Sequence, residues 1–368
     1  MSETLEKYNL HIITSLGLGG AETSLYNSLA GSSSENIVVN LSAPGKYSDP
    51  LRALGVTVYD LSLKRTSWRG LFAARNLLRK LTRNHDTDVF CWMYHPALLF
   101  FLAFPFSRKC TWLIRHGQYF DDRSLKKLIV SLLLIPISRV ACKDIIYNSW
   151  FSRKSHERFL FPKSIGRVVL NFTPADRCRF SVDDRVRLRR MLGLTDAQTV
   201  YGCLARFHRD KGQDRLLKSW QRRPADTKNI LLLQGYGCPE GVLGFFGGEG
   251  NTPPNVLVFD NRFSPSEFYS MIDAYVLPSR TESYPNSLAE AYLSGCFCVT
   301  VGVGDALAIV DHDAVALSNE DVASQLDLVV SNGESVWPIT PTERSARVAK
   351  RKKEGSLRDH LVALGIDK

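Results

Sequence analysis

Short apolar runs alternate along the chain with longer amphipathic stretches, and most of the runs end at a glycine, a proline or a polar residue. Runs of about four to eight apolar residues are typical of strands, whereas apolar positions spaced about three and four apart indicate helices. This alternation predicts an α/β protein with helices covering parallel sheets. The expected strands are 8–15, 37–41, 56–61, 88–95, 110–116, 144–149, 168–171, 199–205, 229–234, 256–260, 275–277 and 298–301. The expected helices run from the first glycine loop to residue 29 and over 68–83, 213–220, 287–293 and 341–353.

The length of the chain predicts two domains. Its 368 residues exceed what one hydrophobic core usually organises. Pro174 follows the last strand of the first half, and proline breaks regular structure. We therefore expect a hinge at 172–185, with one domain over 1–175 and another over 176–340.

Two carboxylates flank a predicted turn from strand to helix. Glu282 lies in the loop after the strand at 275–277, and Glu290 lies about one turn inside the helix at 287–293. Parallel sheets bind ligands beyond the carboxyl ends of their strands, and a helix N-terminus offers N–H groups to an anion. The two acids therefore fit a ligand site. Alternatively, Glu290 is a solvated helix residue and Glu282 a loop charge.

Basic residues and glycines follow other expected strands. Arg206 and Lys211 flank the loop after 199–205, and a guanidinium with an ammonium group suits a diphosphate. The alternative is a basic surface turn. Gly19 and Gly20 follow the first strand, where they allow a ligand to approach the backbone or simply form a tight turn.

A histidine ends each of two neighbouring expected strands. His95 closes the strand at 88–95, and His116 closes the strand at 110–116. One such histidine is usually structural. Two that face the same cleft favour a functional role.

The run from Glu282 to Gly295, E-S-Y-P-N-S-L-A-E-A-Y-L-S-G, resembles the E-x7-E signature of the retaining glycosyltransferases of group 1, also called family 4. R-x4-K-G at 206–212 is similar to that family's phosphate-binding loop, and L-x-x-G-G-A-E at 16–22 resembles its first glycine loop. The resemblance is clearest over 199–310 and weaker over 10–180. It implies two Rossmann-like domains that face each other across a cleft, the arrangement called GT-B.

The resemblance also implies roles for single residues. In the family, the position of Glu282 contacts hydroxyls of the donor sugar, that of Glu290 contacts the ribose, and that of His116 lies near the reacting carbon. The implied catalytic residues are His116, Glu282, Arg206 and Lys211; the implied donor-binding residues are Gly19, Gly20, Arg206, Lys211, Gly235, Ser283, Tyr284, Pro285, Asn286 and Glu290; and His95 is expected on the acceptor side.

By the same resemblance, residues 1–175 form the acceptor-side domain and residues 176–340 bind the nucleotide sugar. Residues 341–368 are expected to form a helix that crosses back to the first domain. The chain departs from the family at three places: Phe172 stands where glycine is usual, Phe297 where proline is common, and Val301-Gly302 where Thr-Asp is common.

The net charge of +10 is concentrated in the first half, where a basic run lacks any acid between Asp60 and Asp86. Such a run fits an anionic surface or a solvated helix face. Two apolar segments next to basic residues, 96–106 and 126–136, are too short to span a membrane. They fit helices that lie on anionic lipid, or buried core helices. We see no nucleic-acid-binding module.

No signal peptide opens the sequence, so we expect a cytoplasmic protein, with the membrane hypothesis placing it on the inner face of the cytoplasmic membrane. The eight cysteines lack metal-binding spacing and are expected as reduced thiols. Asp311-His312-Asp313 is interpreted as a loop. We expect no metal and no cofactor besides the nucleotide sugar substrate.

Together with the resemblance, these observations predict a metal-independent glycosyltransferase that moves a sugar from a nucleotide diphosphate sugar to a glycan or lipid-linked acceptor in cell-surface polysaccharide biosynthesis. Retention of the anomeric configuration is implied by the resemblance. Arg206, Lys211 and the helix after Gly20 are placed to stabilise the departing diphosphate. Two alternatives remain open. One is a nucleotide-sugar epimerase of the same architecture, and the other is a non-catalytic nucleotide-sugar-binding protein.

Overall fold

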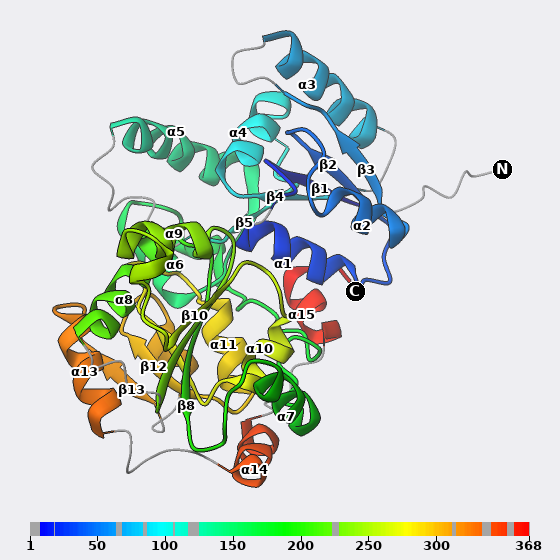
Figure 1. The fold of residues 1–368 in the computed structure, drawn as a ribbon. Helices are drawn as coiled ribbons and strands as arrows, with labels where there is room; N and C mark the ends of the chain where they lie inside the picture. The colour runs from blue at the N-terminus through cyan, green and yellow to red at the C-terminus, as the bar shows by residue number, and fades with distance from the viewer. Residues whose placement is uncertain are drawn as a thin grey trace. The chain divides into compact units, whose positions relative to one another are not determined.

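The chain forms two compact units (Figure 1), which we call the first unit, residues 1–172 and 355–368, and the second unit, residues 173–354. The computed structural model describes residues 8–17, 19–63, 68–83, 87–105, 107–116, 125–222, 228–310, 314–332, 340–351 and 357–367. The helix expected from residue 341 therefore stays with the second unit, and the return to the first unit begins at 355.

The described part of the first unit contains a seven-stranded parallel sheet in the order β3-β2-β1-β4-β5-β6-β7. The direction of winding reverses between β1 and β4, and open parallel sheets bind ligands at such a reversal. The strands are β1 (Tyr8–Ile13), β2 (Asn36–Asn40), β3 (Thr57–Asp60), β4 (Thr87–Trp92), β5 (Cys110–Ile114), β6 (Cys142–Tyr147) and β7 (Gly166–Val168). The helices are α1 (Gly20–Leu29), α2 (Ser48–Ala53), α3 (Trp68–Arg83), α4 (Tyr94–Ala103), α5 (Leu125–Ala141), α6 (Trp150–Arg158), the short η1 (Lys163–Ile165) and α15 (Leu357–Leu364).

The first sheet is buried on both faces. Leu10 and Ile12 of β1 pack into one hydrophobic cluster, while Ile13 packs with Trp92 into the cluster on the other face. A strand covered on both sides needs apolar residues at successive positions, which explains its continuous apolar sequence. His11 is fully buried beside Trp92, whose indole N–H donates to His11 Nδ1 (3.2 Å). Burial lowers the pKa of His11 to about 4.

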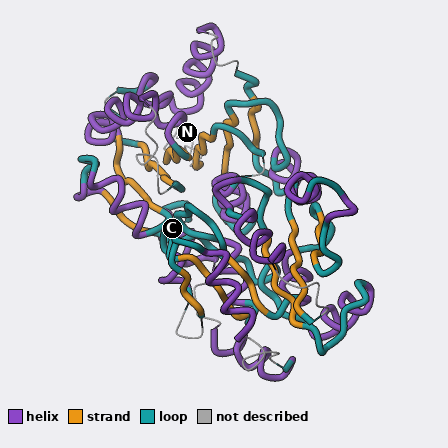
Figure 2. The backbone as a smooth tube through the Cα atoms, turned by 60° about the vertical axis from the view of Figure 1, so that its left-hand side comes forward, coloured by secondary structure: helices purple, strands orange, loops and turns teal. Residues whose placement is uncertain are grey.

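The described residues of the second unit form a six-stranded parallel sheet in the order β10-β9-β8-β11-β12-β13. Here the winding reverses between β8 and β11. Figure 2 shows helices on both sides of the strands. The strands are β8 (Thr199–Leu204), β9 (Asn229–Gln234), β10 (Val256–Phe259), β11 (Ala274–Leu277), β12 (Phe297–Val301) and β13 (Val315–Leu317). The helices are α7 (Val182–Met191), η2 (Arg209–Lys211), α8 (Gln213–Arg222), α9 (Cys238–Phe246), η3 (Glu249–Asn251), α10 (Pro265–Met271), α11 (Asn286–Leu293), α12 (Ala306–Ile309), α13 (Val322–Asn332) and α14 (Pro341–Arg351).

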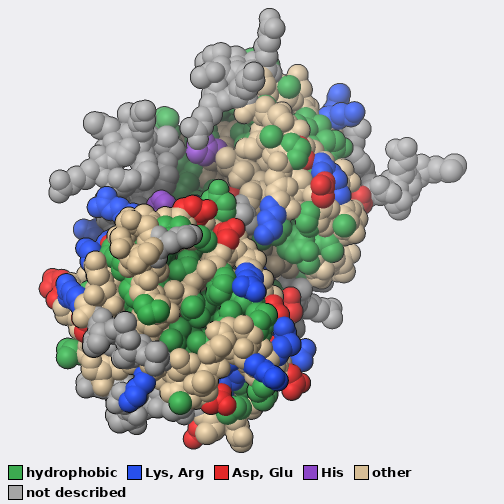
Figure 3. All heavy atoms as spheres, in the orientation of Figure 1, with side chains coloured by type: hydrophobic (Ala, Val, Ile, Leu, Met, Phe, Trp, Pro, Cys, Tyr) green, Lys and Arg blue, Asp and Glu red, His purple; other side chains and the backbone are tan. Residues whose placement is uncertain are grey.

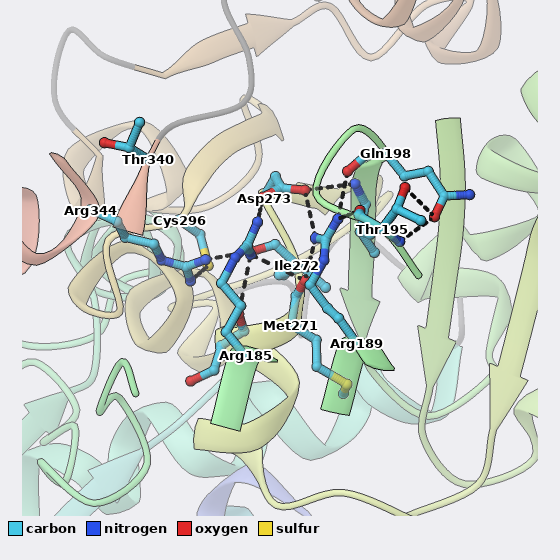
Figure 4. Close-up of polar contacts among 12 residues, drawn as sticks. Arg185, Arg189, Thr195, Gln198, Met271, Ile272, Asp273, Cys296, Thr340 and Arg344 are labelled. Atoms are coloured by element: carbon cyan, nitrogen blue, oxygen red, sulfur yellow. Dashed lines mark hydrogen bonds and ion pairs between the residues drawn. The ribbon is translucent and has the colours of Figure 1, made fainter. Parts of the chain in front are cut away.

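A buried ionic cluster closes the amino-terminal edge of the second sheet (Figure 4). Asp273 immediately precedes β11 and accepts hydrogen bonds from Arg185 Nη2 (2.5 Å) and Arg189 Nη1 (3.1 Å). Arg344 of α14 donates to the backbone carbonyl of Ile272 (2.5 Å). Because these donors come from α7 and α14, the cluster fixes both helices to the sheet at the edge opposite the strand carboxyl ends.

The two apolar segments of the membrane hypothesis differ in how far their side chains are buried. The segment 96–106 falls mainly in α4, whose Leu99 and Phe100 are buried in the core of the first unit. The segment 126–136 falls in α5, where Leu132 and Leu133 are 60% and 54% exposed. Among the described helices, none is long and apolar enough to cross a bilayer. On the visible face of the second unit, basic side chains are interspersed with acidic and apolar ones (Figure 3).

Candidate functional site

Lys211 and Glu282 meet where the winding of the second sheet reverses. Lys211 ends η2 in the loop after β8, and Glu282 lies in the loop after β11. Lys211 Nζ donates to Glu282 Oε1 at 2.7 Å, and Ser279 Oγ donates to the same oxygen at 2.8 Å. The Lys211 side chain is 29% exposed and that of Glu282 is 10% exposed. The pair is therefore accessible from solvent while it is largely enclosed by protein.

A second ion pair joins the first turn of α8, just after Lys211, to the loop that carries Glu282. Arg280 donates through both terminal nitrogens to Asp214, at 2.6 and 2.7 Å, and its backbone N–H donates to the carbonyl of Asp210 (2.8 Å). The Asp214 carboxylate raises the pKa of Arg280, and Arg280 lowers the pKa of Asp214. Such bidentate pairs fix geometry as well as charge. Arg280 and Asp214 thus position Lys211 and Glu282, and neither was expected as a site residue from the sequence.

Two glycines let the loops of this edge approach closely. Gly212 has φ +70°, and a Cβ there would lie 2.2 Å from the carbonyl oxygen of Pro278. Gly304 has φ +58°, and its Cβ would lie 2.5 Å from the carbonyl oxygens of Glu282 and Ser283. A side chain at either position would clash with backbone and occupy a disfavoured conformation. These glycines keep the loop that carries Glu282 between its neighbours.

Glu290 lies on α11 and is buried, with its own set of partners. Arg177 Nε donates to Oε1 (2.6 Å), Arg177 Nη2 approaches Oε2 (3.3 Å), and the Tyr269 hydroxyl donates to Oε2 (2.9 Å). Burial, followed by the charge of Glu290, raises the pKa of Tyr269 well above its usual value. The carboxylate is therefore held in a fixed orientation. Arg177 comes from the expected hinge segment, and its contact with Glu290 was not anticipated.

The other residues of the implied site in the second unit also lie just beyond the carboxyl ends of the strands of its sheet. Arg206 is exposed after β8, and no acid in the described part of the chain pairs with it. The burial of Tyr284 and the nearby Asp305 raise the pKa of Tyr284 to about 12. The structure thus gathers these residues at the carboxyl edge of one sheet and brings Lys211 and Glu282 into contact. They are Arg206 and Lys211 after β8, Gly235 after β9, Glu282, Ser283, Tyr284 and Pro285 after β11, and Asn286 and Glu290 in α11.

The first unit has a pocket of about 250 Å³ at its own reversal point, between the ends of β1, β4 and β5. Gly20, Glu22, Met93, Arg115 and His116 are among its lining residues. Gly19 precedes α1 as its N-cap.

His95 does not end a strand. β4 stops at Trp92, because Met93 adopts φ +72° and Tyr94 begins α4. His95 therefore lies exposed in the first turn of that helix, and it is not among the residues that line the pocket. Arg115 and Glu22 line the pocket but were not proposed as site residues from the sequence, although Glu22 ends the first glycine motif and Arg115 precedes His116.

The described residues contain no group of three or more histidine, cysteine, aspartate or glutamate side chains arranged to hold a metal ion. Asp311-His312-Asp313 lies outside the described residues.

Residues 198–331 match the sequence model described as "Glycosyl transferases group 1". No curated protein sequence matches the chain. The crystal structure of HepE from Anabaena in complex with UDP-glucose has a TM-score of 0.78 at 16% identity and covers 98% of both chains. A glycosyltransferase from Rickettsia africae has a TM-score of 0.77 at 12% identity, covering 97% of this chain and 96% of that chain.

A third similar structure is WaaG, a glycosyltransferase involved in lipopolysaccharide biosynthesis. Its TM-score is 0.75 at 14% identity, with 97% of this chain and 99% of that chain covered. These structures extend the likeness from the matched segment to the fold of both units. The chain therefore has the GT-B fold, and its residues 198–331 match the model of the glycosyltransferases of group 1.

Proposed function

We propose that the protein is a retaining, metal-independent glycosyltransferase that uses a nucleotide diphosphate sugar as its donor. The observation that carries this proposal is the Lys211–Glu282 ion pair at the reversal point of the second sheet. It lies within the segment that matches the family. An ammonium and a carboxylate at one strand edge give separate contacts to a phosphate and to sugar hydroxyls.

The proposed chemistry depends on where negative charge develops. When the bond between the anomeric carbon and the diphosphate oxygen breaks, the diphosphate gains charge, and Lys211 and Arg206 stabilise it. Losing one preorganised contact of this kind commonly lowers the rate by about 100- to 1,000-fold. Glu282 orients the sugar, and Glu290, held by Arg177 and Tyr269, accepts hydrogen bonds from the ribose. The cations of the chain thereby take the place of a metal ion.

We further propose a glycan or lipid-linked acceptor that binds to the first unit and serves cell-surface polysaccharide biosynthesis. The involvement of WaaG in lipopolysaccharide biosynthesis supports this substrate class. The exposed Leu132 and Leu133 of α5 and the basic residues of α3 support peripheral contact with the inner face of the cytoplasmic membrane. Flotation with anionic liposomes at low salt tests the contact, and absence of binding there excludes it.

The decisive experiment is a binding and transfer assay with UDP-glucose, the ligand named for HepE, and with other nucleotide diphosphate sugars. We expect at least one donor to raise the melting temperature of the wild-type protein. Lys211→Met should weaken donor binding and lower the transfer rate by about 100- to 1,000-fold. Lys218→Met, which removes an exposed lysine on α8, should change neither. If no donor stabilises the protein, the proposal is wrong. Conversion of the donor sugar without any acceptor identifies an epimerase instead.

A further inference from the structure

Arg115 is a buried arginine of the first unit that lacks a counter-ion. It follows β5, is 9% exposed and lines the pocket at the sheet reversal. Its Nη1 donates to Asn171 Oδ1 (3.0 Å) and approaches the carbonyl of Val169 (3.4 Å). Its Nε and Nη2 have no hydrogen-bond partner. No acid within the described ranges forms an ion pair with it.

Other buried arginines of the chain show how unusual this arrangement is. Arg185 and Arg189 share the carboxylate of Asp273. Arg344 has no carboxylate partner, but its nitrogens donate to backbone carbonyls such as that of Ser294 (3.1 Å). Only Arg115, among these four, leaves two adjacent nitrogens unused. Nε and Nη2 form one edge of the guanidinium, and this edge binds the two oxygens of a carboxylate or phosphate in parallel.

Burying a cation without a counter-ion is energetically unfavourable, and the lowered pKa of Arg115 reflects this. Desolvation lowers the pKa of Arg115 to about 9. Moving a charge away from water without a partner is destabilising. Met93, which lines the same pocket, holds a strained backbone conformation with φ +72°. Such departures persist where the surrounding structure enforces them, and they concentrate at binding sites.

The pocket also holds an acid that does not pair with Arg115. The Glu22 carboxylate accepts a hydrogen bond from Ser15 Oγ at 2.7 Å and also lines the pocket. Trp92 lies beneath the guanidinium of Arg115, with its ring centroid 5.3 Å from the guanidinium carbon. The site therefore combines a hydrogen-bond acceptor, an aromatic surface and an unused donor pair. Hydroxyl groups suit the acceptor, and an anionic group suits the donor pair.

We propose that Arg115 binds the carboxylate or phosphate group of an acidic sugar in the pocket of the first unit, with Glu22 accepting hydrogen bonds from the hydroxyls of that sugar. This proposal rests on the glycosyltransferase function proposed above, because that function makes the ligand a sugar. The acidic sugar is either part of the acceptor or the transferred sugar of the donor, and both carry the same chemistry.

The test compares acidic with neutral sugars on the wild-type protein and on Arg115→Met, by calorimetric titration. Glucuronate and glucose 6-phosphate, set against glucose, probe the acceptor source. UDP-glucuronate, set against UDP-glucose, probes the donor source. We expect one acidic probe to bind wild-type protein about 10-fold or more tighter than its neutral partner, which corresponds to one charge-assisted contact. Arg115→Met should abolish this preference, and Arg115→Lys should retain part of it.

Two controls separate the possible failures. Arg139→Met removes an exposed arginine of the same unit and should keep the preference. UDP titration tests the second unit independently: if UDP binds while acidic and neutral probes bind alike, the Arg115 proposal is overturned and the proposed function stands. If no nucleoside diphosphate binds, the proposed function fails, whatever the sugar preference. An acidic preference that survives in Arg115→Met also overturns the assignment of Arg115.

Discussion

Glu282 partly neutralises Lys211 in the free protein, which leads to a prediction with opposite effects on two ligands. Glu282→Gln keeps the size of the side chain and removes its charge. Free UDP carries the diphosphate without a sugar, so it should bind the freed Lys211 more tightly in this variant. A nucleotide diphosphate sugar should lose the contact between the carboxylate and its hydroxyls. The substitution is therefore expected to strengthen UDP binding and weaken donor binding.

The geometry sets the size of both effects. The two charges are 2.7 Å apart, but the Lys211 side chain is 29% exposed, so solvent screening limits the contribution of the pair to about 1 kcal/mol. Release of Lys211 should then strengthen UDP binding by about fivefold. A hydrogen bond to a charged group contributes about 1.5–3 kcal/mol, so loss of this contact should weaken the binding of a nucleotide diphosphate sugar by about 10- to 150-fold. The stronger contact between its diphosphate and Lys211 should offset part of this loss.

Calorimetric titrations of UDP and UDP-glucose measure both changes on the same preparation. Glu240→Gln, which removes an exposed acid near the start of α9, is the matched control and should leave both affinities unchanged. High salt should reduce the gain in UDP affinity, because the effect is electrostatic. If Glu282→Gln weakens UDP and UDP-glucose by the same factor, Glu282 maintains the loop structure instead, and the reasoning is refuted.

Three further predictions concern the stability of the two units and the loop that carries Lys211. Asp273→Asn should destabilise the second unit by about 3–5 kcal/mol in urea unfolding, because two buried arginines lose their partner, and the folded protein should still bind UDP. Gly212→Ala should weaken UDP binding through displacement of the Lys211 loop, whereas Gly244→Ala, where a Cβ meets nothing within 4 Å, should not. Burial lowers the pKa of both His11 and His156 from 6.5 to about 4, so the unfolded chain binds more protons between these values. Stability should be full above about pH 6.5 and fall towards pH 4, and thermal melts of His156→Gln should show a smaller loss. Equal slopes for wild type and this variant would contradict the assignment.

Local patterns predicted the elements of this chain well. The alternation of apolar runs and amphipathic stretches placed the main strands, since strands buried on both faces need continuous apolar sequence. Turn residues placed Glu282 in a loop and Glu290 in the following helix, as the structure shows. The meeting of Lys211 with Glu282 follows from strand order, because β8 and β11 are neighbours at the reversal point. Sequence spacing alone does not give that order.

Contacts between residues far apart in the chain could not be predicted from the sequence. Asp214 and Arg280 are 66 positions apart in the chain, and neither residue belongs to a motif. His95 was misplaced because Met93 ends β4 in a strained conformation that its residue type does not announce. The burial of Arg115 depends on residues such as Asn171, far along the chain. Each case depends on tertiary contacts, which local patterning does not encode.

The charged residues at the two edges of the second sheet differ in burial and in pairing. This difference supports ligand binding at the carboxyl edge. At the amino-terminal edge, Asp273 is shared by Arg185 and Arg189, so the buried charges satisfy one another. At the carboxyl edge, Lys211 and Glu282 remain partly open to solvent, and Arg206 has no acidic partner among the described residues. A cation held near a site without a partner is stabilised when an anion arrives. We therefore expect ligands to stabilise this protein chiefly through the carboxyl edge, while the amino-terminal cluster sets its stability in their absence.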